Sequence, residues 1–113
     1  MKSLRYLSVL LVLFAMASVP AFADRTKTVM VTNNTSLNLT EFYASPSADS
    51  SWDTTNNLLA GQTLAPGQST TITIADGEHH CHYDLMAILY GSAEYAYQYE
   101  VDTCSGGSWA VSQ

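Results

Sequence analysis

The stretch HCHYDLMAILYGSAEYAYQYEV, residues 80–101, decides the fold of this chain. Its apolar and polar side chains alternate with a period of two, and Gly91-Ser92 divides it into two runs of strand length. The pattern predicts two long strands, residues 80–90 and 93–101. The second half of the first run is apolar on both faces, which is typical of a central strand.

Shorter runs of the same kind flank this pair, and clusters of Asn, Gly, Pro, Ser and Asp separate them. They predict strands or extended segments at residues 26–32, 37–44, 58–64, 69–74 and 108–111. In residues 37–44 the alternation places Leu37, Leu39 and Tyr43 on one face. Residues 45–57 have no periodicity and are expected to form a long loop. The chain therefore favours an all-β fold, a small two-sheet antiparallel β-sandwich of about six to seven strands.

The N-terminus has the pattern of a cleavable export signal. Lys2 and Arg5 precede an apolar run at residues 7–17, and Ala21-Phe22-Ala23 is a small-x-small cleavage pattern. The run is shorter than the roughly 20 residues that a membrane-spanning helix needs. The sequence predicts a signal peptide at residues 1–23, a bacterial periplasmic or secreted location, and no membrane anchor after cleavage.

The two cysteines fit that location. Cys81 and Cys104 are the only cysteines, and an even number in an exported chain favours a disulfide between them. A pair of free thiols that bind metal is the competing interpretation. The predicted disulfide matters for stability, because a domain this small buries only a modest share of its surface when it folds.

Composition limits the function classes. Removal of residues 1–23 leaves 90 residues, enough for a single domain at residues 24–113. That domain has two basic residues against ten carboxylates, a net charge of minus eight with histidine neutral. Such a chain is repelled by nucleic acid and by anionic headgroups, so neither is an expected partner. The simplest interpretation of the acidic composition is that it keeps the protein soluble.

All three histidines lie within four positions of one another, in the string Glu78-His79-His80-Cys81-His82. Imidazole is a common ligand of copper and zinc, and alternate residues of a strand share a face about 7 Å apart. A metal site is therefore an alternative function, with Glu78 or Asp84 as further ligands. The spacing matches no zinc motif, and solvent-facing residues after the Asp76-Gly77 turn are the favoured interpretation.

Three tyrosines recur with a period of two at Tyr95, Tyr97 and Tyr99. An exposed row of this kind is a candidate platform for a ligand such as a sugar or a peptide. The simpler interpretation, which the sequence favours, is that the row forms the inner face of the sandwich, with the hydroxyls reaching its edge.

No motif indicates catalysis. The chain has no G-x-S-x-G elbow, no glycine-rich phosphate loop and no carboxylate spacing that specifies a glycosidase. The leading hypothesis is an exported, non-catalytic binding or interaction module whose partner is an unknown protein or small ligand. No cofactor is expected, and the alternative is a periplasmic copper- or zinc-binding protein that uses His79, His80 and His82.

Several strings of this chain also resemble a group of small, exported, uncharacterised bacterial β-sandwich proteins, over nearly the whole of residues 24–113. The strings are VTNNT at 31–35, YASPS at 43–47, LAPGQS at 64–69, DG at 76–77, CHYDL at 81–85 and VDTC at 101–104. The resemblance implies a shared small sandwich with the cysteines paired. It implies no activity.

Overall fold

The computed structural model describes residues 26–113, and the predicted signal peptide at residues 1–23 lies outside the described residues. All regular elements in this part of the chain are strands. They are β1 (Lys27–Asn33), β2 (Leu39–Pro46), β3 (Ser69–Ile74), β4 (His82–Leu89), β5 (Ala96–Asp102) and β6 (Gly107–Val111).

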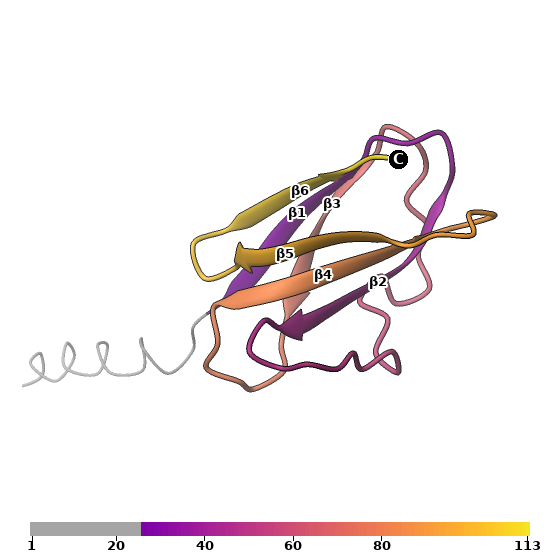
Figure 1. The fold of residues 1–113 in the computed structure, drawn as a ribbon. Coiled ribbons are helices and arrows are strands. Elements are labelled where there is room, and N and C mark those ends of the chain that lie inside the picture. Colours follow the sequence, from indigo (N-terminus) through magenta and orange to yellow (C-terminus); the bar gives the residue numbers. More distant parts are fainter. Residues whose placement is uncertain (1–25) are drawn as a thin grey trace, which may run out of the picture.

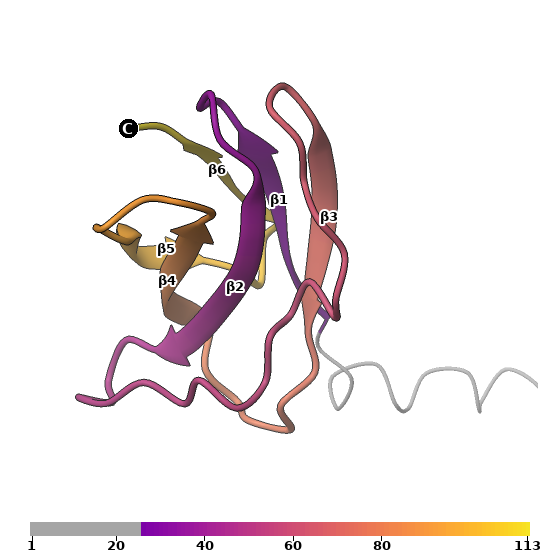
Figure 2. The same ribbon diagram turned by 90° about the vertical axis from the view of Figure 1, so that its right-hand side faces the viewer.

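The strands form two three-stranded sheets that pack face to face (Figures 1 and 2). One has the order β3-β1-β6 and the other β2-β4-β5. The predicted two-sheet sandwich is confirmed, with one difference in strand direction. β6 pairs with β1 in parallel, because the chain leaves β5, crosses to the opposite sheet and enters it beside the first strand.

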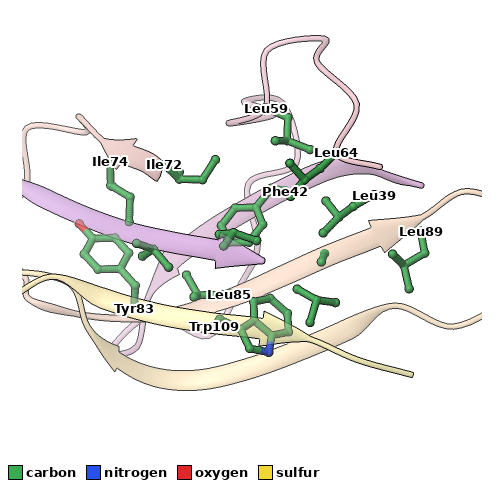
Figure 3. Close-up of a cluster of buried hydrophobic side chains, with 14 residues drawn as sticks. Leu39, Phe42, Leu59, Leu64, Ile72, Ile74, Tyr83, Leu85, Leu89 and Trp109 are labelled. Carbon is green, nitrogen blue, oxygen red and sulfur yellow. The ribbon is translucent and has the colours of Figure 1, made fainter. Parts of the chain in front are cut away.

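The core lies between the sheets and follows the alternation of each strand (Figure 3). β4 contributes Tyr83, Leu85, Ala87 and Leu89, as its period of two predicts. Trp109 of β6 is 9% exposed, and its ring centroid lies 6.0 Å from that of Phe42. The short tail strand therefore completes the core. The other buried members of the cluster are Val29, Val31, Leu39, Leu59, Leu64, Ile72, Ile74 and Val111.

β2 departs from the predicted alternation. Its pairing with β4 shifts register between Leu39 and Glu41, where one strand has an irregularity or bulge. A bulge changes which side chains face inward beyond it. Leu39 and Phe42 both lie in the core, whereas Tyr43 lies on the outer face of the sheet. The prediction that Leu39 and Tyr43 share a face is therefore wrong.

Residues 58–64 do not form the predicted third strand. They fold as successive turns, and only Leu64 makes a β-bridge, with Leu39. The Asn57 side-chain oxygen accepts hydrogen bonds from the backbone N–H of Phe42 (3.0 Å) and of Leu59 (3.0 Å), which ties the turns to the edge of β2. The leucines of this segment pack against the core, where Leu59 is 3% exposed.

The first residue of β6 leaves no room for a side chain. A Cβ atom on Gly107 would lie 2.6 Å from Val101 Cγ1 and 3.1 Å from the Asp102 carbonyl oxygen. We expect Gly107→Ala to lower the free energy of unfolding by about 1–3 kcal/mol, because the clash forces the β5–β6 crossing apart. Urea unfolding should show this loss, while Ser108→Ala, at the exposed neighbouring position, should stay within about 0.5 kcal/mol of the wild type.

Candidate binding surface

The three tyrosines at residues 95–99 are exposed. Tyr95, Tyr97 and Tyr99 have exposed fractions of 49%, 42% and 59%. The favoured interpretation of the sequence, that they form the inner face of the sandwich, is therefore wrong. Tyr97 lies opposite Met86 and Met86 lies opposite Tyr43, so these side chains share the outer face of the sheet β2-β4-β5.

A bulge in β5 explains the error. Tyr83 pairs with Val101 and Leu85 pairs with Gln98, so Tyr99 and Glu100 together oppose the single residue Asp84. Glu100, one of these two residues, has a φ of 53°, in the left-handed region. Val101 packs against the core, and the tyrosines, which the sequence alternation puts on the same face as Val101, point outward.

Trp52, from the loop that follows β2, extends the tyrosines into what we call the aromatic row: Trp52, Tyr97 and Tyr99. The ring centroids of Tyr97 and Tyr99 are 5.9 Å apart with planes 6° from parallel, and those of Trp52 and Tyr97 are 6.0 Å apart. Two buried side chains of the outer face adjoin the row, Met86 (3% exposed) and Tyr43 (5%). A hydrogen bond of 2.5 Å from the Tyr43 hydroxyl to Glu41 Oε1 raises the pKa of Tyr43 to about 12, so this support stays neutral.

Asp84 holds the two segments that carry the row. Its Oδ1 accepts a hydrogen bond from the backbone N–H of Glu100 (2.9 Å) in the bulge. The same oxygen accepts a hydrogen bond from the Ser47 hydroxyl (2.7 Å), at the start of the loop that carries Trp52. The sequence suggested Asp84 as a metal ligand, but in the structure it fixes the bulge and the loop relative to each other.

We expect Asp84→Ala to disorder the aromatic row and to lower the free energy of unfolding by about 1–3 kcal/mol, because hydrogen bonds to a charged acceptor are lost. Asp84→Asn keeps an oxygen acceptor in the same place and should lose less than half as much. Urea unfolding measures the loss, and the near-ultraviolet circular dichroism of the aromatic rings measures the disorder. An unchanged aromatic spectrum in Asp84→Ala would show that the bulge holds without this carboxylate.

A pocket of about 230 Å³ adjoins the row, and Trp52 forms part of its wall. The loop after β2 supplies Asp49 and Asp53, and the loop between β3 and β4 supplies Asp76 and Glu78. Both loops lie at the same end of the sandwich (Figure 2). The last residues of β2 and Ser51 complete the lining.

One pocket carboxylate, Asp76, is neutralised from inside the protein. Lys27, 3% exposed, donates hydrogen bonds to Asp76 Oδ1 (2.5 Å), the Tyr83 hydroxyl oxygen (2.8 Å) and the Glu78 carbonyl oxygen (3.0 Å). The Tyr83 hydroxyl donates to Asp76 Oδ2 (2.5 Å). We call Lys27, Asp76 and Tyr83 the lysine triad; Lys27 and Tyr83 are buried, and the Asp76 side chain is 30% exposed. All three N–H groups of the ammonium thus have acceptors, which a buried charge requires.

The triad favours the charged forms of both its ionic members. Burial works against the Lys27 ammonium, but hydrogen bonds with Asp76 and Tyr83 outweigh it and raise the pKa of Lys27. Burial likewise works against the Asp76 carboxylate, and the bonds from Lys27 and Tyr83 outweigh it and lower the pKa of Asp76. Burial and the neighbouring carboxylate raise the pKa of Tyr83, which stays a neutral donor.

The structure does not assemble the predicted histidine site. β4 begins at His82, so His79 and His80 lie in the preceding loop and do not alternate with His82 along a strand. His80 Nε2 lies 3.6 Å from Glu78 Oε1, and His82 lies opposite Asp102. Within residues 26–113, the one trio of potential ligands that comes within 4.8 Å is Cys81, Asp102 and Cys104. Its sulfurs form the predicted disulfide, which is confirmed and which excludes them as thiolate ligands.

Comparisons with known proteins add no identity. Protein-family models, curated proteins and solved structures give no match to this chain. In the described residues, no helix has the length and apolarity to cross a membrane.

Sequence reasoning missed three residues that shape this surface. Lys27 precedes Val29 and Val31 at a period of two, and this spacing was the signal that its side chain points inward. Trp52 is the single aromatic residue of residues 45–57, and the absence of periodicity there gave no signal for its position. The alternation of β4 did not indicate that Asp84 accepts a hydrogen bond from the bulge, because the bulge lies in the partner strand, β5.

Proposed function

We propose that this protein is an exported, non-catalytic binding module that holds its ligand on the aromatic row. The observation that carries the proposal is the exposure of Tyr97 and Tyr99 beside Trp52 on one sheet face. Exposed groups of large apolar side chains commonly mark interaction sites, and tyrosine combines apolar area with a hydrogen-bonding hydroxyl.

The setting of the row supports a binding role. Five large apolar side chains of the described residues are exposed, and three of them lie within residues 95–99. The row rests on an ordered sheet, is fixed by Asp84, and loses little side-chain freedom when a ligand covers it. A rigid aromatic surface of this kind suits recognition of a partner.

Binding to arrays of immobilised glycans and peptides tests the proposal. Tyr97→Ala with Tyr99→Ala removes two rings of the row, and Met30→Ala with Tyr90→Ala removes two exposed apolar side chains elsewhere. We expect the first pair to weaken the best array signal about tenfold or more and the second to leave it unchanged. Equal signals from the two pairs, or no array member that binds the wild type, would contradict the proposal.

Export is the second part of the proposal. The Cys81–Cys104 disulfide is consistent with an oxidising compartment. Mass spectrometry of the protein recovered from the periplasm or medium of a bacterial host should find a chain that begins at Asp24, with both sulfurs oxidised. A cytoplasmic product that retains residues 1–23 would contradict it.

A further inference from the structure

The described surface carries charge of one sign. Residues 26–113 contain nine carboxylates and a single Lys or Arg residue, Lys27. Lys27 is buried in the triad and is matched by Asp76. No arginine or lysine side chain of the described residues therefore reaches solvent. Eight further carboxylates have no Lys or Arg partner from this part of the chain, and Glu78 has only His80 Nε2 beside it, at 3.6 Å.

Several of these carboxylates border the aromatic row. Glu100 follows Tyr99 in the bulge, and Asp53 follows Trp52 in the loop. Trp52 both contacts Tyr97 and lines the pocket that contains Asp49 and Glu78. The row and the pocket thus share Trp52 and form one surface that carries both aromatic rings and carboxylates.

This surface suits an organic cation better than a bare metal ion. In the described part of the chain, no three pocket carboxylates bring oxygens within 4.8 Å of one another, so they do not form a compact ligand set. A guanidinium or ammonium group on a long side chain is larger, binds carboxylates by hydrogen bonds and is attracted to the faces of Trp and Tyr rings.

We propose that the ligand of the aromatic row is a cationic peptide segment. One Arg or Lys side chain enters the pocket between Trp52 and Glu78, and a second lies against Tyr97 and Tyr99. This inference rests on the proposed function and names its ligand class. Charge complementarity carries it, because a negative surface speeds the encounter with a basic segment and disfavours acidic partners.

Isothermal titration calorimetry of the exported protein with synthetic peptides tests the inference. The probes are a Gly-Gly-Arg repeat peptide of about nine residues, long enough to span about 30 Å when extended, and Gly-Gly-Gln and Gly-Gly-Glu repeats of equal length. We expect a Kd of about 10–100 μM for the arginine peptide and no measurable binding of the other two. Raising the salt from about 20 mM to about 300 mM should weaken it tenfold or more, because ions screen the attraction.

Two matched variants locate the interaction. Glu78→Gln removes one pocket charge, and Glu94→Gln removes one charge near the opposite end of β5, in the turn between β4 and β5. We expect Glu78→Gln to weaken binding of the arginine peptide about threefold. Glu94→Gln should change the Kd of that peptide by less than half as much. Trp52→Ala should weaken it about fivefold. Equal effects of the two glutamine variants would mean attraction by net charge alone and would overturn the inference.

A neutral oligosaccharide separates this inference from the proposed function. If chitohexaose or cellohexaose binds, and the Tyr97→Ala with Tyr99→Ala variant loses it while the arginine peptide stays unbound, the row is a binding site and the cationic ligand is wrong. If the arginine peptide binds equally well to that variant, the row is not its site. If neither probe binds the wild type, the cationic inference fails.

Discussion

Asp76→Asn is expected to lower the free energy of unfolding by about 3–5 kcal/mol, the typical cost of leaving a buried charge without its counter-ion. Lys27 is 3% exposed and has no route to solvent that would replace the carboxylate. Lys27→Met should cost less, because the Asp76 side chain that it leaves behind is about 30% exposed and water reaches it. Urea unfolding of both variants measures the difference.

The double variant is the control for this asymmetry. Lys27→Met with Asp76→Asn removes both charges, so it should be more stable than Asp76→Asn alone and show a coupling energy above about 1 kcal/mol in the double-mutant cycle. Strict additivity of the two single losses would contradict a direct ion pair in the folded protein.

The pH dependence follows from the directions of the pKa shifts. The folded pKa of Asp76 is lowered, so its stabilising contribution is present above the ordinary aspartate pKa of about 3.9 and is lost as the pH falls below it. The folded pKa of Lys27 is raised, so its contribution is present below the ordinary lysine pKa of about 10.4 and is lost as the pH rises above it. The stability difference between wild type and Asp76→Asn should therefore be level near neutral pH and shrink in acid.

Removal of the disulfide is expected to cost about 3 kcal/mol. Cys81 precedes β4 and Cys104 follows β5, and the bond closes a loop across a sequence separation of 23. A closed loop of this length restricts the unfolded chain by about that amount in the chain-entropy description. Cys81→Ala with Cys104→Ala should lower the Tm by about 12–24 °C, as calorimetry would measure.

Chemical reduction supplies the matched comparison. A thiol reductant should lower the Tm of the wild type toward that of the double alanine variant and leave the variant unchanged. A loss below about 1 kcal/mol would mean that the hydrogen bonds from Thr103 to the Cys81 carbonyl oxygen, at 2.8 Å, hold this end of the sheet without the covalent bond.

The fold class was predictable because most inward positions alternate strictly. Val29, Val31, Ile72 and Ile74 all lie where a period of two places them. The errors sit at register shifts. Each shift reverses the inward and outward faces of the residues beyond it, and its cause is a contact with another strand rather than a property of the local sequence.

The binding surface was less predictable than the fold for the same reason. The sequence pattern of the tyrosines is the same whether they face the core or the solvent. The bulge opposite Asp84 decides which face they occupy. The pocket also joins two loops about 25 residues apart in the sequence, and no motif indicates that these loops lie together. The disulfide was predictable because the chain has two cysteines, which allow one pairing, together with a predicted export signal.

The parallel pairing of β6 with β1 has a consequence for the order in which the protein is made. β1, at residues 27–33, lies between β3 and β6, and it gains its second neighbour only from residues 107–111, the last strand of the described residues. Contacts so distant in sequence slow folding, because a long loop closes before they form. If the proposed export carries the chain across a membrane N-terminus first, β1 gains its second neighbour only after residues 107–111 have followed.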